Sequence, residues 1–161
     1  MPLTWGEITV RLVLSMLLGG FIGWEREVEG KPAGLRTLML VSLGAGVYVV
    51  SGVNAAVRVQ EPIDALRVMS GIAGGVGFLG AGLILRTRGE VRLLTTAAAV
   101  WGAAAIGMAA GLGEYYAAAL GGVLVFVTLH YIDALEKRML GKTKAKRKRD
   151  HDEKGDESDA G

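Results

Sequence analysis

The chain of 161 residues lacks cysteine altogether and holds only two histidines, His130 and His151. The absence of cysteine excludes disulfides, zinc–thiolate sites and cysteine nucleophiles. Two histidines leave little for a histidine-based metal centre or for activating a serine nucleophile. Acidic residues are also missing from the long apolar runs. These absences argue against an enzyme, so we expect no catalytic residue and no cofactor.

What is abundant is apolar sequence, which makes up 51% of the residues. Five charge-poor runs are separated by short polar segments, and a helix needs about 20 mainly apolar residues to cross a bilayer. A soluble chain of buried helices would have too few polar residues for its outer surface. We therefore predict an all-α, multi-pass membrane domain over residues 1–136. Its five transmembrane helices are expected at about 6–25, 37–56, 68–86, 93–112 and 115–133.

The basic residues predict how the helices are oriented, because Lys and Arg collect in cytoplasmic loops. They cluster after the first run, after the third run and in the tail, whereas the opposite side carries only Arg11, Arg58 and Arg67. The pattern places the N-terminus outside and the C-terminus in the cytoplasm. Residues 137–161 are polybasic and then acidic, which predicts a disordered tail. Its basic half is expected to contact anionic lipid, and no nucleic-acid binding is expected.

Glycine is the second abundant feature, with 25 residues. Small residues four apart let helices in a membrane approach closely, so we expect a tightly packed bundle. The Gly74–Gly77 segment is also the place where we expect a bent or broken helix, if there is one. The glycines expected to pack helices together are Gly19, Gly23, Gly71, Gly75, Gly77, Gly80, Gly82, Gly107 and Gly111.

The segment after the first run, GFIGWEREVEGKPAGLRT, places acids and bases at membrane depth. Ionisable groups at that depth usually face the bundle and find partners, so we expect a polar cluster here. Glu25 and Glu29 are four residues apart and share a helical face. The alternative is a solvated cap whose bases only orient the helices. The candidate cluster comprises Glu25, Arg26, Lys31, Arg36, Thr37, Thr95, Thr96 and Trp101.

Thr95 and Thr96 begin the fourth run, where capping the helix is the favoured interpretation and hydrogen bonding inside the bundle is the alternative. Trp101 lies within that run, so we expect it to pack against a neighbouring helix. Isolated polar residues are expected to bond across helices, namely Ser42, Ser51, Asn54 and Ser70.

Three of these segments resemble the signatures of the MgtC/SapB family of membrane proteins. The first is GGFIGWEREVEGKPAGLRT, the second GGVGFLGAGLILR and the third LLTTAAAVWGAAAIGMAAG. Their order and spacing agree with the family over about residues 10–130. The sequence departs from the pattern at Leu38, where the family often has His, and at Leu93, where it often has Gly. It resembles a short form, without the soluble C-terminal domain of longer members.

The resemblance implies a bacterial inner-membrane protein linked to growth at low magnesium and, in some pathogens, to survival inside host cells. It favours a non-enzymatic regulator that binds a membrane-protein partner or a second copy of itself. The alternative is an ion transporter or ion-binding protein with a polar pocket at the cytoplasmic mouth, in which Mg²⁺ is the ion to consider.

Overall fold

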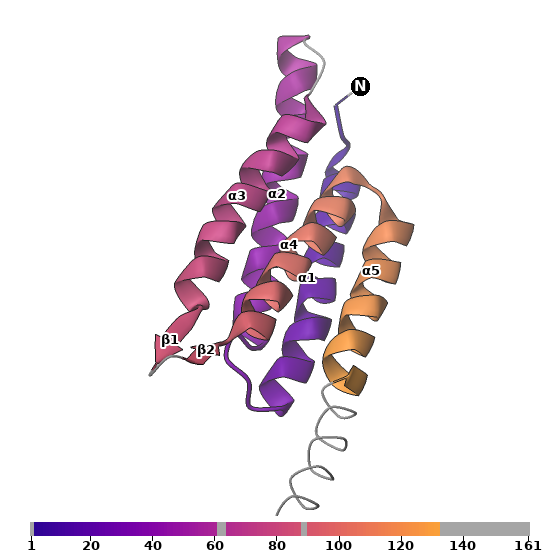
Figure 1. The fold of residues 1–161 in the computed structure, drawn as a ribbon. Coiled ribbons are helices and arrows are strands. Elements are labelled where there is room, and N and C mark those ends of the chain that lie inside the picture. Colours follow the sequence, from indigo (N-terminus) through magenta and orange to yellow (C-terminus); the bar gives the residue numbers. More distant parts are fainter. Residues whose placement is uncertain (1, 61–63, 88–89, 133–161) are drawn as a thin grey trace, which may run out of the picture. The chain divides into compact units, whose positions relative to one another are not determined.

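The computed structural model describes residues 2–60, 64–87 and 90–132. These residues form five helices and one short hairpin (Figure 1). The helices are α1 (Trp5–Val28), α2 (Leu35–Val59), α3 (Ala65–Leu83), α4 (Leu94–Leu112) and α5 (Tyr115–Val127), and a π-helical turn follows at Thr128–Ile132. The all-helical fold class is confirmed, while the predicted tail at 137–161 lies outside the described residues.

Helices α1 to α4 are each long and apolar enough to cross a membrane. The fifth is shorter in the described part of the chain, with 13 residues of α-helix before the π-helical turn. Residue 133, the expected end of the fifth span, is not among the described residues. The structure falls into two units whose boundary in the chain lies between Phe126 and Val127, so the π-helical turn belongs to the second unit.

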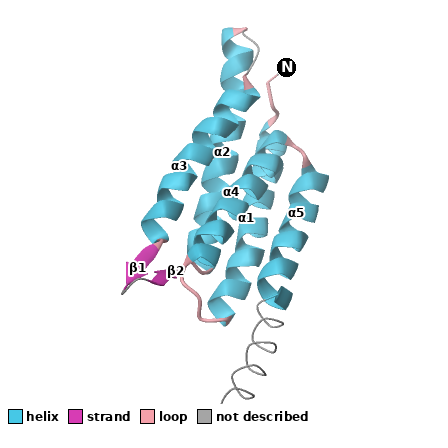
Figure 2. Ribbon diagram, viewed as in Figure 1, coloured by secondary structure: helices cyan, strands magenta, loops and turns pink. Residues whose placement is uncertain are grey.

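The connection between α3 and α4 is an antiparallel hairpin, which the sequence did not suggest (Figure 2). Strand β1 (Leu85–Thr87) pairs with β2 (Glu90–Arg92), and Leu85 lies opposite Arg92. After β2 the chain turns into α4 at Leu93, which has a left-handed φ of 69°. Glycine favours that conformation, so Leu93 is the strained end of a tight entry into α4.

Helices α1, α2 and α4 form the core of the first unit and meet at glycines. A Cβ atom added to Gly107 of α4 would overlap the backbone of Ser42 in α2, and one at Gly19 of α1 would overlap Leu38 and Ser42. At Gly111 it would lie 2.9 Å from the carbonyl oxygen of Gly46. At these positions only glycine lets the backbones touch, which is the packing mode expected of small residues in membranes.

The glycines of α3 depart from that expectation. Apart from the backbone of α3 itself and adjacent residues in the chain, no described residue lies within 4 Å of a Cβ added to Gly71, Gly74, Gly75, Gly77 or Gly82; of the α3 glycines, Gly80 alone has a neighbour there, Ala97 at 3.7 Å. Helix α3 packs mainly on α4 and less on α2. It is also one continuous helix, so no break occurs at Gly74–Gly77. The α3 glycines other than Gly80 therefore do not pack the described bundle together.

Serine hydroxyls bond across the core helices close to these glycines. Ser42 Oγ donates to the Ser15 carbonyl at 2.7 Å, and Ser15 Oγ lies 2.8 Å from the Arg11 carbonyl and 3.3 Å from that of Gly107. The Asn54 amide oxygen accepts from the Leu3 backbone at 3.1 Å. Cross-helix bonding is thus found for Ser42. Asn54 instead bonds the segment before α1, and Ser51 and Ser70 are exposed.

The end of α4 is closed by glycine and arginine. Gly113 adopts a left-handed φ of 90° and its N–H bonds the Ala110 carbonyl, while Gly111 remains helical and buried. Arg11 Nη1 donates to the Gly111 carbonyl at 2.9 Å. A cation here satisfies an orphan carbonyl and opposes the negative end of the helix dipole.

We predict that Gly107→Ala lowers stability by about 1–3 kcal/mol, because the added methyl group forces two packed backbones apart. Gly74→Ala is the matched control. It adds the same methyl group where no described atom is within 4 Å, so its expected effect is a gain of up to about 1 kcal/mol from helix propensity. Thermal unfolding of both variants in one detergent checks this. Equal midpoints would show that the core tolerates separation at Gly107.

Candidate functional site

The candidate site lies where α1 ends and α4 begins. Arg26, on the last turn of α1, is only 4% exposed, and Thr96, in the first turn of α4, is 2% exposed. Arg26 Nη2 donates to Thr96 Oγ1 at 3.0 Å across 70 residues of sequence. A charge buried this deeply needs hydrogen bonds, and Thr96 provides one. The contact joins the end of α1 to the beginning of α4, which carry the first and third signature segments.

The Arg26 guanidinium is not fully satisfied within the part of the chain that the structure describes. Its Nε atom is buried and has no hydrogen-bond partner there. Leaving a buried donor unpaired costs about 1–3 kcal/mol. The Thr96 hydroxyl is therefore an acceptor that this end of the bundle cannot easily lose.

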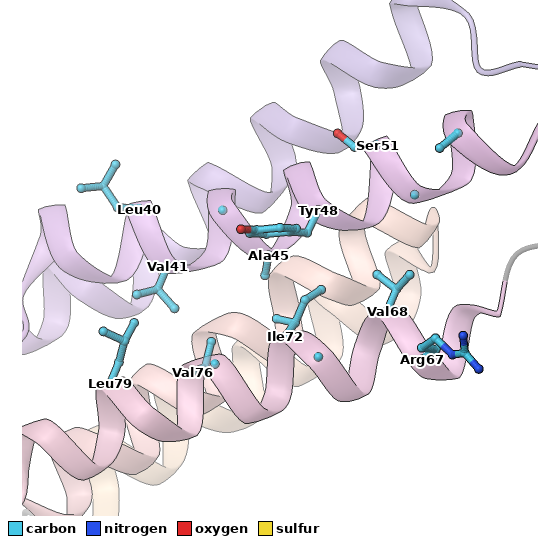
Figure 3. Close-up of a pocket in the computed structure, with 15 residues that line it drawn as sticks. Leu40, Val41, Ala45, Tyr48, Ser51, Arg67, Val68, Ile72, Val76 and Leu79 are labelled. Carbon is cyan, nitrogen blue, oxygen red and sulfur yellow. The ribbon is translucent and has the colours of Figure 1, made fainter. Parts of the chain in front are cut away.

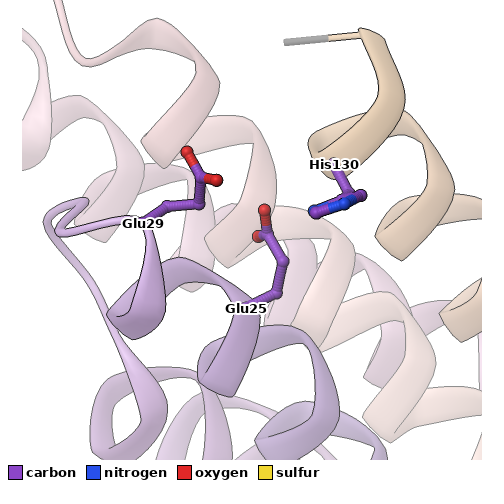
Figure 4. A group of neighbouring side chains, drawn as sticks. All are labelled: Glu25, Glu29 and His130. Atoms are coloured by element: carbon purple, nitrogen blue, oxygen red, sulfur yellow. The ribbon is translucent and has the colours of Figure 1, made fainter. Parts of the chain in front are cut away.

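Glu25 lies beside Arg26 and is also buried, at 5% exposure. Glu29 is one turn further along α1 and exposed, and the two carboxylates have oxygens within 4.8 Å of one another (Figure 4). The shared helical face predicted from their spacing is therefore present. His130, also drawn in Figure 4, belongs to the second unit. Two neighbouring carboxylates alone do not define a metal site.

The loop after α1 returns through a defined turn. Gly30 and Ala33 have left-handed φ values of 64° and 57°, and the Lys31 N–H donates to the Arg26 carbonyl at 2.9 Å. Glu27 Oε2 then accepts from the Leu35 N–H at 2.8 Å. Because Gly34, the N-cap of α2, provides no side chain, Glu27 supplies the missing cap and places a negative charge at the positive helix end.

Glycines let this loop lie against its own helix. A Cβ atom at Gly34 would be 2.9 Å from Glu27 Oε2, and one at Gly23 would be 2.7 Å from the Leu35 Cα. Glu27 is absent from the candidate residues predicted from the sequence. An acid shortly before a helix whose N-cap is glycine is a signal that could have indicated its capping role.

The remaining candidates are not part of the buried contact. Arg36, Thr37 and Thr95 are exposed and Lys31 is half-buried. The favoured capping role for the threonines is wrong, because Leu93 is the N-cap of α4 and Thr96 instead bonds Arg26 within the bundle. Trp101 is 53% exposed, so it does not bury itself against a neighbouring helix as expected.

The long apolar helices and the buried polar contact at their end define a multi-pass helical membrane protein. A model of the MgtC family matches residues 12–138. The chain therefore belongs to the MgtC family, and the resemblance of its three signatures is confirmed.

Several curated relatives show the same likeness. Protein SrpB of Synechococcus elongatus is 38% identical over 83% of this chain and 79% of its own length. The "Putative magnesium transporter YhiD" of Escherichia coli K12 is 36% identical over 84% of this chain and 65% of its own length. Protein MgtC of Salmonella typhimurium (strain LT2) is 42% identical over 66% of this chain and 44% of its own length. The chain thus spans between about half and four fifths of these relatives' lengths, and no solved structure matches it.

We predict that Thr96→Val destabilises the protein by about 1–3 kcal/mol, because it removes the acceptor of a buried guanidinium while preserving side-chain shape. Thr95→Val, one residue away and exposed, is the control and should change stability by less than about 0.5 kcal/mol. Unfolding of both variants in detergent gives the comparison. The Arg26→Met background should shrink the effect of Thr96→Val; an unchanged effect would show that the two side chains are not coupled.

We also predict that Glu27→Ala lowers stability by about 1 kcal/mol through loss of the α2 cap. Glu29→Ala is the matched control, since Glu29 is also exposed but does not accept from the Leu35 N–H. Hydrogen exchange of the first turn of α2 should accelerate in Glu27→Ala only. Equal exchange in both variants would contradict the capping role.

Proposed function

We propose that this protein is a non-enzymatic regulator in the bacterial inner membrane, linked to magnesium or other cation homeostasis. It acts by packing its helices against a membrane-protein partner or a second copy. The link to magnesium is supported by family membership and by the name of the YhiD relative. The mode of action is supported by the structure of α3.

The observation that carries the proposal is the outward face of α3. Gly74 and Gly77 are exposed, and so are Ser70 and Ala81 one turn to either side. Each glycine inside a helix costs about 1 kcal/mol relative to alanine, and within the described bundle nothing contacts Gly74 or Gly77. In α1 and α4 the equivalent cost is offset by close packing. On α3 a helix from outside the described bundle would offset it in the same way.

The proposed orientation puts the N-terminus outside and the C-terminus in the cytoplasm. The connection between α1 and α2 and the hairpin between α3 and α4 then lie inside, with their Lys and Arg residues, as the positive-inside rule requires. The Arg26–Thr96 contact would stand at the cytoplasmic end of the bundle.

The second candidate function is ion transport or ion binding, favoured by the YhiD name and by the buried Glu25. Oxygen ligands suit Mg²⁺, which one or two carboxylates can hold together with water. Helices α2 to α5 contain no Asp or Glu, which is a poor lining for a cation path. We therefore rank transport below regulation.

The natural lack of cysteine makes the test of the regulator direct. We predict that single-cysteine variants Gly74→Cys and Gly77→Cys crosslink in native membranes to a partner protein or a second copy. The Ala119→Cys control, on an exposed position of α5, should give no specific adduct. Replacing Gly74 and Gly77 by leucine should abolish the adduct and impair growth at limiting magnesium at unchanged protein abundance. No adduct at either α3 position would remove the basis of the proposal.

Transport is tested separately in proteoliposomes. A Mg²⁺ flux that disappears in Glu25→Gln, but persists in Glu29→Gln, would favour the second function over the first. If the protein is a regulator, we expect no Mg²⁺ flux above that of empty vesicles in either variant.

A further inference from the structure

A groove of about 960 Å³ runs between α2 and α3 (Figure 3). Its volume lies at the upper end of the range for small-molecule sites, which is about 300–1,000 Å³. The α2 wall includes Gly44 and Tyr48, and the α3 wall includes Gly71, Gly75 and Ile72. An added Cβ at Gly44, Gly71 or Gly75 would meet no described atom within 4 Å. The glycines therefore leave real space along an almost wholly apolar channel.

The length of the groove indicates what kind of molecule fits. Its lining runs from Arg67 to Leu79 on α3 and from Leu40 to Ala55 on α2, which at 1.5 Å per residue is about 18 Å and about 23 Å. A bilayer's hydrocarbon core is about 30 Å thick, so the groove stops short of crossing it. Val41 and Leu79 face each other at the inner end (Figure 3). A partner helix needs a surface across the whole membrane, whereas an acyl chain occupies one leaflet, so the length favours an acyl chain.

The charge at the outer end completes the match. Arg67 lines the groove where α3 begins, and its side chain is 88% exposed. Its Nε lies 3.5 Å from Asp64 Oδ2, but that carboxylate is also more than half exposed, so water screens the pair. An arginine at an interface extends its guanidinium toward the headgroups, where it can bind a phosphate by charge-assisted hydrogen bonds.

We propose that the α2–α3 groove is a binding site for a phospholipid. One acyl chain lies along Gly71 and Gly75 toward Leu79, and the headgroup phosphate pairs with Arg67. This inference goes beyond the regulatory function and does not depend on it. It uses the groove-lining glycines of α3, whereas the proposed partner contact uses Gly74 and Gly77, which do not line the groove.

The experiment measures binding of dioleoyl phosphatidylglycerol to the full chain by native mass spectrometry, after delipidation in a mild detergent. Gly71→Leu with Gly75→Leu fills the groove and should weaken binding about tenfold through lost apolar contact. Gly74→Leu with Gly77→Leu makes the same chemical change on the outward face and should leave binding unchanged. The milder Gly71→Ala with Gly75→Ala, expected to give an intermediate loss, decides the matter if the leucine pair does not fold.

The headgroup contact is tested with dioleoylglycerol, which has the same chains but no phosphate. Wild type should prefer the phospholipid, and Arg67→Ala should lose that preference while Arg58→Ala keeps it. Equal binding of phosphatidylglycerol by wild type and the groove-filled variants would overturn the proposal. Equal affinity of wild type for the two lipids would also overturn it. The same holds if a second copy or another protein is bound to wild type and is lost from the groove-filled variants, because that molecule would then be the occupant of the groove.

Discussion

Direct contact between helix backbones at glycine is the constraint on which the rest of the structure depends. Gly19, Gly107 and Gly111 bring α1, α2 and α4 so close that one added methyl group would overlap a neighbouring backbone. In a bilayer the lipid is as apolar as the helices, so association relies on packing and hydrogen bonds. That closeness places Ser15 and Ser42 within reach of carbonyl groups on other helices. It also brings α1 close enough to both ends of α4 for Arg11 and Arg26 to form their hydrogen bonds.

The two ends of the core use arginine differently. Arg11 bonds a carbonyl at the end of α4, where the helix dipole favours a cation. Arg26 bonds a hydroxyl at the beginning of α4, where the dipole of α4 disfavours a cation but the C-terminal end of its own helix, α1, favours one. The second arrangement lies within the most recognisable signature of the family. Burial of Glu25 beside it supplies charge of the opposite sign at the same depth.

The sequence predicts the helices well because each is a long apolar run bounded by charges or glycine. It also predicts the polar cluster in part: burial of Arg26 and involvement of Thr96 follow from charge at membrane depth and from the signatures. It cannot say which threonine turns inward, because Thr95 and Thr96 differ only by their position on the helix. Nor can it tell that Gly107 is in contact while Gly75 is open, since small-residue spacing is the same whether or not a neighbour is present. The Glu27 cap depends on how the loop between α1 and α2 folds back toward Leu35, and the sequence does not specify that path.

The two arginines of α1 have a consequence for the order in which the protein is made. Arg26 and Arg11 find their partners 70 and 100 residues later in the chain. At roughly 5–20 residues per second, α1 waits several seconds in or beside the bilayer before α4 is made. During that time both cations depend on water, headgroups or the insertion machinery. Helix α1 can already pack on α2 through Gly19 and Ser15, so completion of α4 is the event that gives its two arginines their partners.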